Sequence, residues 1–198
     1  YLNRSRVSLD YIPRDNNHPY RPAIIFRMAE AYLSYAEALN ESSERMSHKQ
    51  EILDNLNKIR HRAGIAEYGT GTDENGFTRI KINFSDQKEV RRLIHKERRV
   101  EFVGEGVRYH DLRRWKTAHY GIGNLNEQGE NPDWGVNGPD YGMNYYGTEY
   151  TDQGDNAFFK RTKYMDRVYP RKFYWYPIHQ SEIDKDPTLV QGPFWLGE

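Results

Sequence analysis

Two glutamates, Glu97 and Glu101, stand where a predicted helix should place apolar side chains. The helix is expected to begin near Ser85 or Asp86. Its apolar stripe opens with Val90, Leu93 and Ile94. The next members of that stripe are the two glutamates, whose Cβ atoms would lie about 5–6 Å apart on a helix. Because retaining glycosidases hold two carboxyl groups about 5–5.5 Å apart, the spacing is compatible with a glycoside hydrolase that uses Glu97 and Glu101.

A structural role is the alternative that we favour for these carboxylates. Two carboxylates on one helix point the same way, whereas the pair of a glycosidase flanks the scissile bond. A carboxylate on a packing face needs a cationic partner, since leaving it uncompensated costs about 3–5 kcal/mol. We therefore expect no catalytic residue and a structural charge network composed of Glu97, Glu101, Glu105, Arg108, Asp111 and Arg113.

Aromatic side chains form the second group suited to chemistry. They lie in residues 117–156, the Gly/Tyr-rich excursion, where helical periodicity stops. A ring can stack on the apolar face of a pyranose while amides and carboxylates bond the hydroxyls. The same rings could instead fill a thin core beneath a long loop, and the sequence leaves both interpretations open. The candidate glycan platform consists of Trp134, Tyr141, Asn144, Tyr145 and Tyr146.

Metal and cofactor sites find no support in the sequence. The 7 histidines form no His-x-x-x-His or Glu-x-x-His pattern on a predicted helix. There is no cysteine, which excludes thiolate ligands and disulfides. A run that starts at Asn124 resembles a calcium loop, but its twelfth position is Gly135 instead of the bidentate glutamate. We expect neither a metal nor a cofactor.

Composition excludes further classes of function. The 198 residues carry 29 basic and 29 acidic side chains, and this balance argues against a nucleic-acid-binding protein. The mean hydropathy is −1.01, and no apolar run approaches the roughly 20 residues of a membrane-spanning helix. With 4 Trp, 16 Tyr and 8 Phe, the core is expected to be rich in aromatic rings.

Periodicity and capping signals predict the elements that must position these residues. A first helix should run from about Pro22 to Asn40. A second should begin at a capping box formed by Ser47 and Gln50 and end at Gly64. The short connection makes the two antiparallel.

The later elements are less regular. Gly104 and Gly106 should end the glutamate-bearing helix, and a shorter helix should resume from Val107 to Trp115. The alternation over residues 168–176 predicts a strand or an extended segment. Residues 181–187 are predicted to form a short capped turn.

Three ordered segments together resemble the SusD-like (RagB/SusD) family of outer-membrane nutrient-binding lipoproteins of Bacteroidetes. The first comprises Arg27 to Leu39, Leu56 to Arg60 and Arg62 to Gly64; the second comprises Glu97 to Phe102 and Glu105 to Trp115; the third comprises Tyr176 to Ile183, Pro187 and Leu189 to Gln191. Each segment alone is a weak signal, but the order and spacing of all three are specific.

The resemblance implies an all-α fold with tetratricopeptide-like helix pairs, and we expect long irregular Gly/Tyr-rich loops and an extended C-terminal tail beside them. It implies that residues 1–198 form the C-terminal part of one domain whose N-terminal half is absent. That part would contain a helical core over about 22–116, the excursion over 117–156 and a closing segment over 157–198. It further implies a non-catalytic glycan-binding subunit, lipid-anchored at the cell surface through an N-terminal cysteine outside this chain. The implied partner is a SusC-like TonB-dependent transporter.

Alternatives remain open at this point. A RagB-like peptide importer subunit fits the same resemblance, and a tetratricopeptide-like protein scaffold would use the same helix pairs. The excursion carries 7 acidic and no basic side chains, which disfavours an anionic ligand by like-charge repulsion. The expected ligand of the excursion is therefore neutral or cationic, and a neutral oligo- or polysaccharide is favoured.

Overall fold

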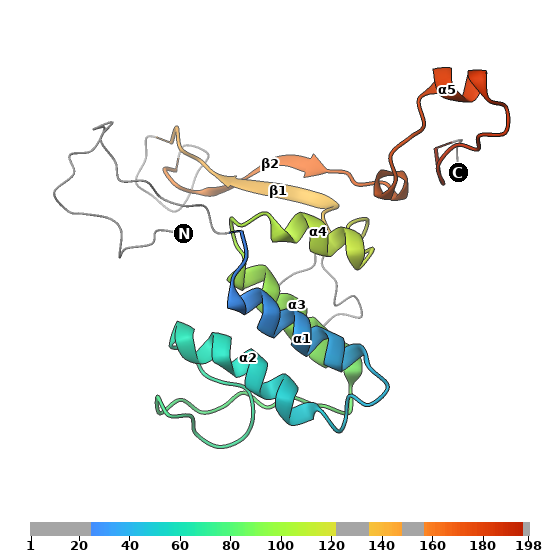
Figure 1. The fold of residues 1–198 in the computed structure, drawn as a ribbon. Coiled ribbons are helices and arrows are strands. Elements are labelled where there is room, and N and C mark those ends of the chain that lie inside the picture. The colour runs from blue at the N-terminus through green and yellow to red at the C-terminus, as the bar shows by residue number, and fades with distance from the viewer. Residues whose placement is uncertain (1–24, 122–134, 148–156, 196–198) are drawn as a thin grey trace, which may run out of the picture. The chain divides into compact units, whose positions relative to one another are not determined.

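The computed structural model describes residues 25–121, 135–147 and 157–195 (Figure 1). The chain divides into two compact units, Tyr1–Gly106 and Val107–Glu198. The first contains α1 (Met28–Glu41), α2 (Lys49–Ala63) and α3 (Gln87–Glu101). The second contains α4 (Val107–Arg114), β1 (Gly138–Met143), β2 (Arg161–Arg167), the 3-10 helix η2 (Arg171–Tyr174) and α5 (Gln180–Lys185). This confirms the predominantly helical fold and adds a two-stranded ribbon that the sequence did not predict.

The core of the first unit lies between its three helices. α1 packs against both α2 and α3 (Figure 1), because each helix presents apolar residues at helical spacing on one face. The buried apolar side chains of the three helices are Ala29, Leu33, Ala36, Ile52, Leu56, Ile59, Val90, Leu93 and Ile94. Burial of each large aliphatic side chain stabilises the fold by about 1.5–3 kcal/mol.

The first helix begins later than the sequence predicted. Helical structure starts at Met28, after Arg27 with φ −144° and ψ 155°, so the predicted start at Pro22 is wrong. Arg27 is held extended because its side chain bonds Glu101 and Glu105, which lie far along the chain. A tertiary contact thus overrides a local start signal.

The predicted capping box of α2 is also wrong. His48 is the N-cap residue, and no side chain caps this end. The Ser47 hydroxyl donates instead to the Glu44 carbonyl at 2.7 Å, and Gln50 bonds Asp54. The predicted stop is confirmed, since Gly64 adopts the left-handed conformation with φ +68°.

α3 begins at the predicted place. The Asp86 carboxylate accepts from the backbone N–H of Lys88 and Glu89 at 2.9 and 3.3 Å, which satisfies two otherwise unpaired donors. The helix ends at Glu101, with Phe102 as its C-cap, and Gly104 and Gly106, with φ +80° and +77°, form the turn that separates it from α4.

The ribbon corrects the expectation that residues 117–156 form only irregular loops. β1 and β2 pair antiparallel, with a register irregularity between Asp140 and Tyr141, so the excursion contains a strand. Two glycines and a proline give the β1 sequence low strand propensity, and its partner lies outside the excursion. Just beyond β1, Gly147 passes the Ala157 backbone so closely that a Cβ would lie 2.5 Å from it.

The strand or extended segment expected over 168–176 contains η2 instead. Tyr169 and Tyr174 pack ring against ring, with centroids 5.3 Å apart. Arg113 of α4 donates to the Tyr169 hydroxyl at 2.8 Å and to the carbonyls of Phe173 and Tyr174 at 2.8 and 3.0 Å. The alternation of aromatic residues therefore reflects packing around an arginine and not sheet pairing. The short turn predicted after it is α5, capped by His179.

No helix in the described parts of the chain is long and apolar enough to span a lipid bilayer.

Candidate functional site

Glu97 lies at the centre of a buried cluster in the first unit. Only 5% of the residue is exposed. Its carboxylate accepts from Arg60 Nη1 at 2.5 Å and from the Tyr68 hydroxyl at 2.8 Å. Arg60 also donates to the Ala66 carbonyl and lies over the Tyr68 ring, 4.3 Å from its centroid. Burial and then the Glu97 charge raise the pKa of Tyr68 above its usual value, so the phenol remains a donor.

Glu101 and Glu105 share Arg27. Arg27 bonds the Glu101 carboxylate and also donates from Nε and Nη2 to Glu105 at 2.9 and 2.8 Å. Arg62 Nη2 donates to both Glu101 oxygens at 2.6 Å. Burial opposes ionisation of Glu101, but the hydrogen bonds from Arg62 and Arg27 outweigh it and lower the pKa of that carboxyl.

In this arrangement, arginine side chains bind Glu97, Glu101 and Glu105. Glu101 is ionised at neutral pH, because its pKa lies below the usual value, so it does not hold the proton that a general acid must donate. Glu97 has two protein donors on one carboxylate oxygen. The contacts of both residues are those of ion pairs that join α3 to α2 and to the residue before α1.

The remaining members of the expected network lie on α4 and are Arg108, Asp111 and Arg113. α4 belongs to the second unit, so the six residues are divided between the two units. The Asp111 carboxylate accepts from Arg114 at 2.9 Å, and the Arg108 guanidinium lies 6.0 Å from the Trp115 ring centroid.

The candidate glycan platform lies at the end of β1 and in the turn that follows it. Tyr145 and Tyr146 are 70% and 89% exposed, and their rings meet edge to face with centroids 5.5 Å apart and an interplanar angle of 81°. Asn144 anchors the turn, since its N–H donates to the Lys160 carbonyl and its carbonyl accepts from the Phe159 N–H. Two rings at a right angle thus project from an anchored backbone. Trp134 lies outside the described residues.

Tyr141 stands apart from that pair. It is half-exposed on β1, and the Arg161 guanidinium of β2 lies 4.0 Å from its ring centroid. Such a cation–π contact contributes about 0.5–1 kcal/mol at an exposed site. One face of the Tyr141 ring is therefore occupied by the protein.

Every charged side chain of β1 and β2 has a partner. Arg167 bonds Asp140 at 2.5 Å, Lys163 bonds Asp166 at 2.8 Å, and Arg161 covers Tyr141. Asp140, the acidic residue of the excursion that the structure describes, is thus paired with a cation of β2. The described part of the ribbon offers rings and backbone polar groups rather than uncompensated charge.

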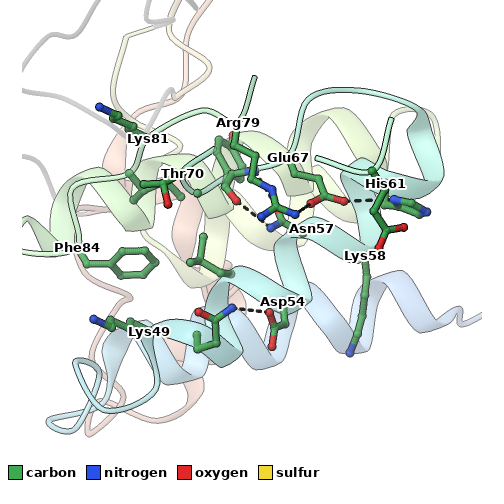
Figure 2. Close-up of a pocket in the computed structure, with 16 residues that line it drawn as sticks. Lys49, Asp54, Asn57, Lys58, His61, Glu67, Thr70, Arg79, Lys81 and Phe84 are labelled. Carbon is green, nitrogen blue, oxygen red and sulfur yellow. Dashed lines mark hydrogen bonds and ion pairs between the residues drawn. The ribbon is translucent and has the colours of Figure 1, made fainter. Parts of the chain in front are cut away.

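A pocket of about 750 Å³ is a second candidate site, which the sequence did not reveal (Figure 2). One wall is the exposed face of α2, and the other is the segment of residues 67–84. Asn57 holds the two together, because its amide donates to the Tyr68 carbonyl at 2.9 Å and accepts from the Tyr68 N–H at 2.8 Å. The sequence showed only a turn-forming segment here, and nothing local indicates that it folds back on α2.

Charges line this pocket. Glu67 accepts from Arg79 at 2.9 Å and lies 3.2 Å from His61 Nδ1 (Figure 2). Behind the wall, the Asp73 carboxylate accepts three backbone N–H bonds. Burial opposes ionisation of this carboxyl, but those bonds lower the pKa of Asp73. No group of three His, Asp or Glu side chains among the described residues is arranged to hold a metal ion.

The first unit consists of packed helices, and the second unit is irregular and rich in aromatic residues. The family model of the SusD family, SusD_RagB, matches residues 2–195. The chain therefore belongs to the SusD family.

Relatives agree with this assignment. The chain is 32% identical over 109 residues to the SusD-like protein P25 of Formosa agariphila, and 32% over 103 residues to the SusD-like protein P38 of the same organism. These matches cover 55% and 52% of this chain but only 18% and 19% of the relatives' own length.

Solved structures show the same fold. A SusD-like protein (BF3747) from Bacteroides fragilis NCTC 9343 superposes with a TM-score of 0.54 at 27% identity, over 87% of this chain and 26% of that protein. Selenomethionine BT4246 superposes with a TM-score of 0.55 at 28% identity, over 89% of this chain and 25% of that protein. The chain thus corresponds to about a quarter of these solved chains.

Proposed function

We propose that this chain serves in a non-catalytic, cell-surface glycan-binding subunit of a SusC/SusD-type nutrient uptake system. Membership of the SusD family supports a nutrient-binding role. The observation that carries the glycan assignment is the exposed, perpendicular pair Tyr145 and Tyr146 on an anchored turn. A pyranose can stack on one ring while the edge of the other bounds it.

A neutral glycan is the proposed ligand of this surface. The charged side chains of β1 and β2 are all engaged with one another or with a ring, so an anionic sugar would find no available cation on the strands. The side-chain amide of Asn144 carries both a donor and an acceptor of the kind that bonds sugar hydroxyl groups. Affinity for such an exposed stacking site should be modest, with a Kd of about 1 mM to 1 μM.

The proposed partner is a SusC-like TonB-dependent transporter in the outer membrane, with the subunit lipid-anchored beside it. This rests on the family alone. The helical first unit would supply a rigid body, and its glutamates would stabilise that body instead of cleaving glycosidic bonds.

Substitution of Tyr146 tests the ligand assignment. Tyr146→Ala should weaken binding of a neutral oligosaccharide about fivefold, which corresponds to the loss of roughly 1 kcal/mol of stacking. The melting temperature should not change, because the side chain is 89% exposed. Isothermal titration calorimetry against a panel of neutral oligosaccharides measures the first effect and differential scanning calorimetry the second.

Tyr164→Ala is the matched control, since Tyr164 is 78% exposed on β2 of the same ribbon but is not in the candidate platform. Equal loss in both variants would contradict a site at Tyr145 and Tyr146. Binding of short peptides with the same dependence on Tyr146 would favour the peptide importer.

A further inference from the structure

We propose that the pocket between α2 and residues 67–84 is a second binding site, for an acidic sugar. It lies in the first unit and does not depend on the tyrosine pair of the ribbon. Its volume of about 750 Å³ falls within the range of about 300–1,000 Å³ that is usual for small-molecule sites. The walls are preformed, because backbone bonds from Ile80 to Glu67 and from Gly69 to Ile80, both 2.8 Å long, close the segment on itself.

Several of the charged side chains that line the pocket already contact other groups of the protein. Glu67 is bonded to Arg79. The Asp54 carboxylate accepts from the neutral Gln50 amide at 2.8 Å and therefore keeps its negative charge. Lys58 turns away toward α1, where its Nζ lies 4.5 Å from the Tyr32 ring centroid (Figure 2).

Two lysines then remain at one end of the pocket. Lys49 and Lys81 line it and have no partner among the described residues. Figure 2 shows both at the end that also holds Phe84 and Thr70, opposite His61. Glu74 is the lining carboxylate without a partner in the described part of the chain, and it lies in an exposed turn.

The combination of one ring and two available cations defines the ligand class. The half-buried Phe84 ring, with Leu53 and Ile82, offers an apolar face for a pyranose. The two ammonium groups offer charge-assisted hydrogen bonds to carboxylate or sulfate substituents, and Thr70 can bond a hydroxyl. A neutral sugar would leave both lysines unused, whereas a sugar ring with anionic substituents engages the ring and the charges together.

Titration of the full chain with trigalacturonic acid and with its methyl ester tests the assignment. The two probes share one carbon skeleton and differ in charge. We expect the acid to bind at least about tenfold more tightly than the ester, as two partly exposed charge contacts would give. A sulfated disaccharide run in parallel distinguishes sulfate from carboxylate as the preferred substituent.

Charge-removing variants localise the site. Lys49→Gln and Lys81→Gln should each reduce affinity for the acidic probe about fivefold. Lys58→Gln is the matched control, because it removes the same charge from the same pocket lining but from a side chain directed at Tyr32; its affinity should stay unchanged. Tyr146→Ala should also leave this binding unchanged, so the site can fail or hold independently of the proposed function.

Several results would overturn the proposal. One is the absence of binding by both the carboxylated and the sulfated sugar. Another is equal affinity for the acid and its ester, or equal losses in all three lysine variants. Triglutamate or inorganic sulfate that binds as tightly, with the same dependence on Lys49 and Lys81, would assign the pocket to acidic peptides or to free anions instead.

Discussion

Glu97 shows at the scale of one residue how a polar group is accommodated in the core of this protein. Its position on the apolar stripe of α3 is visible in the sequence, but its partners are not. Arg60 lies 37 residues away, and the Arg27 that meets Glu101 lies 74 residues away. Spacing along one helix predicts which face a residue occupies, whereas long-range pairing depends on how the helices pack.

Removal of the Glu97 charge should destabilise the first unit. Glu97→Gln leaves Arg60 buried without its carboxylate, which typically costs about 3–5 kcal/mol. Glu105→Gln is the control, because the Glu105 side chain is 25% exposed and Arg27 keeps Glu101 as a partner; its cost should stay below about 1 kcal/mol. Urea unfolding followed by circular dichroism measures both, and equal losses would contradict the buried-pair interpretation.

Glu101 should make stability depend on acid pH. Its pKa in the folded chain lies below the ordinary value, which is about 4.3 for an unfolded chain. The stability it contributes is therefore fully present above that value and is lost as the pH falls through the lower folded pKa. The urea midpoint should fall between about pH 5 and pH 3, and it should fall less steeply in Glu101→Gln. Identical slopes in both proteins would count against this role.

At the scale of elements, sequence signals correctly predicted the features that depend only on contacts within a few residues. The cap of α3 and the glycine stop of α2 are satisfied within a few residues, and both were predictable. β1 was not, because its strand character comes from pairing with β2 across the bulged register. The 67–84 wall of the pocket depends in the same way on the amide of Asn57.

The two candidate caps offer a test of this distinction. Asp86→Ala should cost about 1 kcal/mol, since two N–H groups at the start of α3 lose their acceptor. Ser47→Ala should change stability by less than about 0.5 kcal/mol, although its sequence pattern is that of a capping box, because Ser47 does not cap α2. Chemical denaturation gives both values, and a larger cost at Ser47 would contradict the observed cap.

At the scale of the whole molecule, a net charge of zero conceals how the charges are distributed. In the first unit, glutamates and arginines join helices. On the ribbon, Arg167 of β2 compensates Asp140 of the excursion. In the pocket, two lysines are left available among the described residues. The sequence alone showed the acidic excursion but not the strand that faces it, so the preference for neutral glycans now rests on the paired charges of the ribbon.

Direct binding of neutral oligosaccharides by the chain is the measurement that tests the central claim. Titration calorimetry, with reducing ends assayed in the same samples, should show at least one ligand with a Kd of about 1 mM to 1 μM and no release of new reducing ends. A chain that binds none of the neutral oligosaccharides, or that cleaves those it binds, would contradict the account of a non-catalytic glycan-binding subunit.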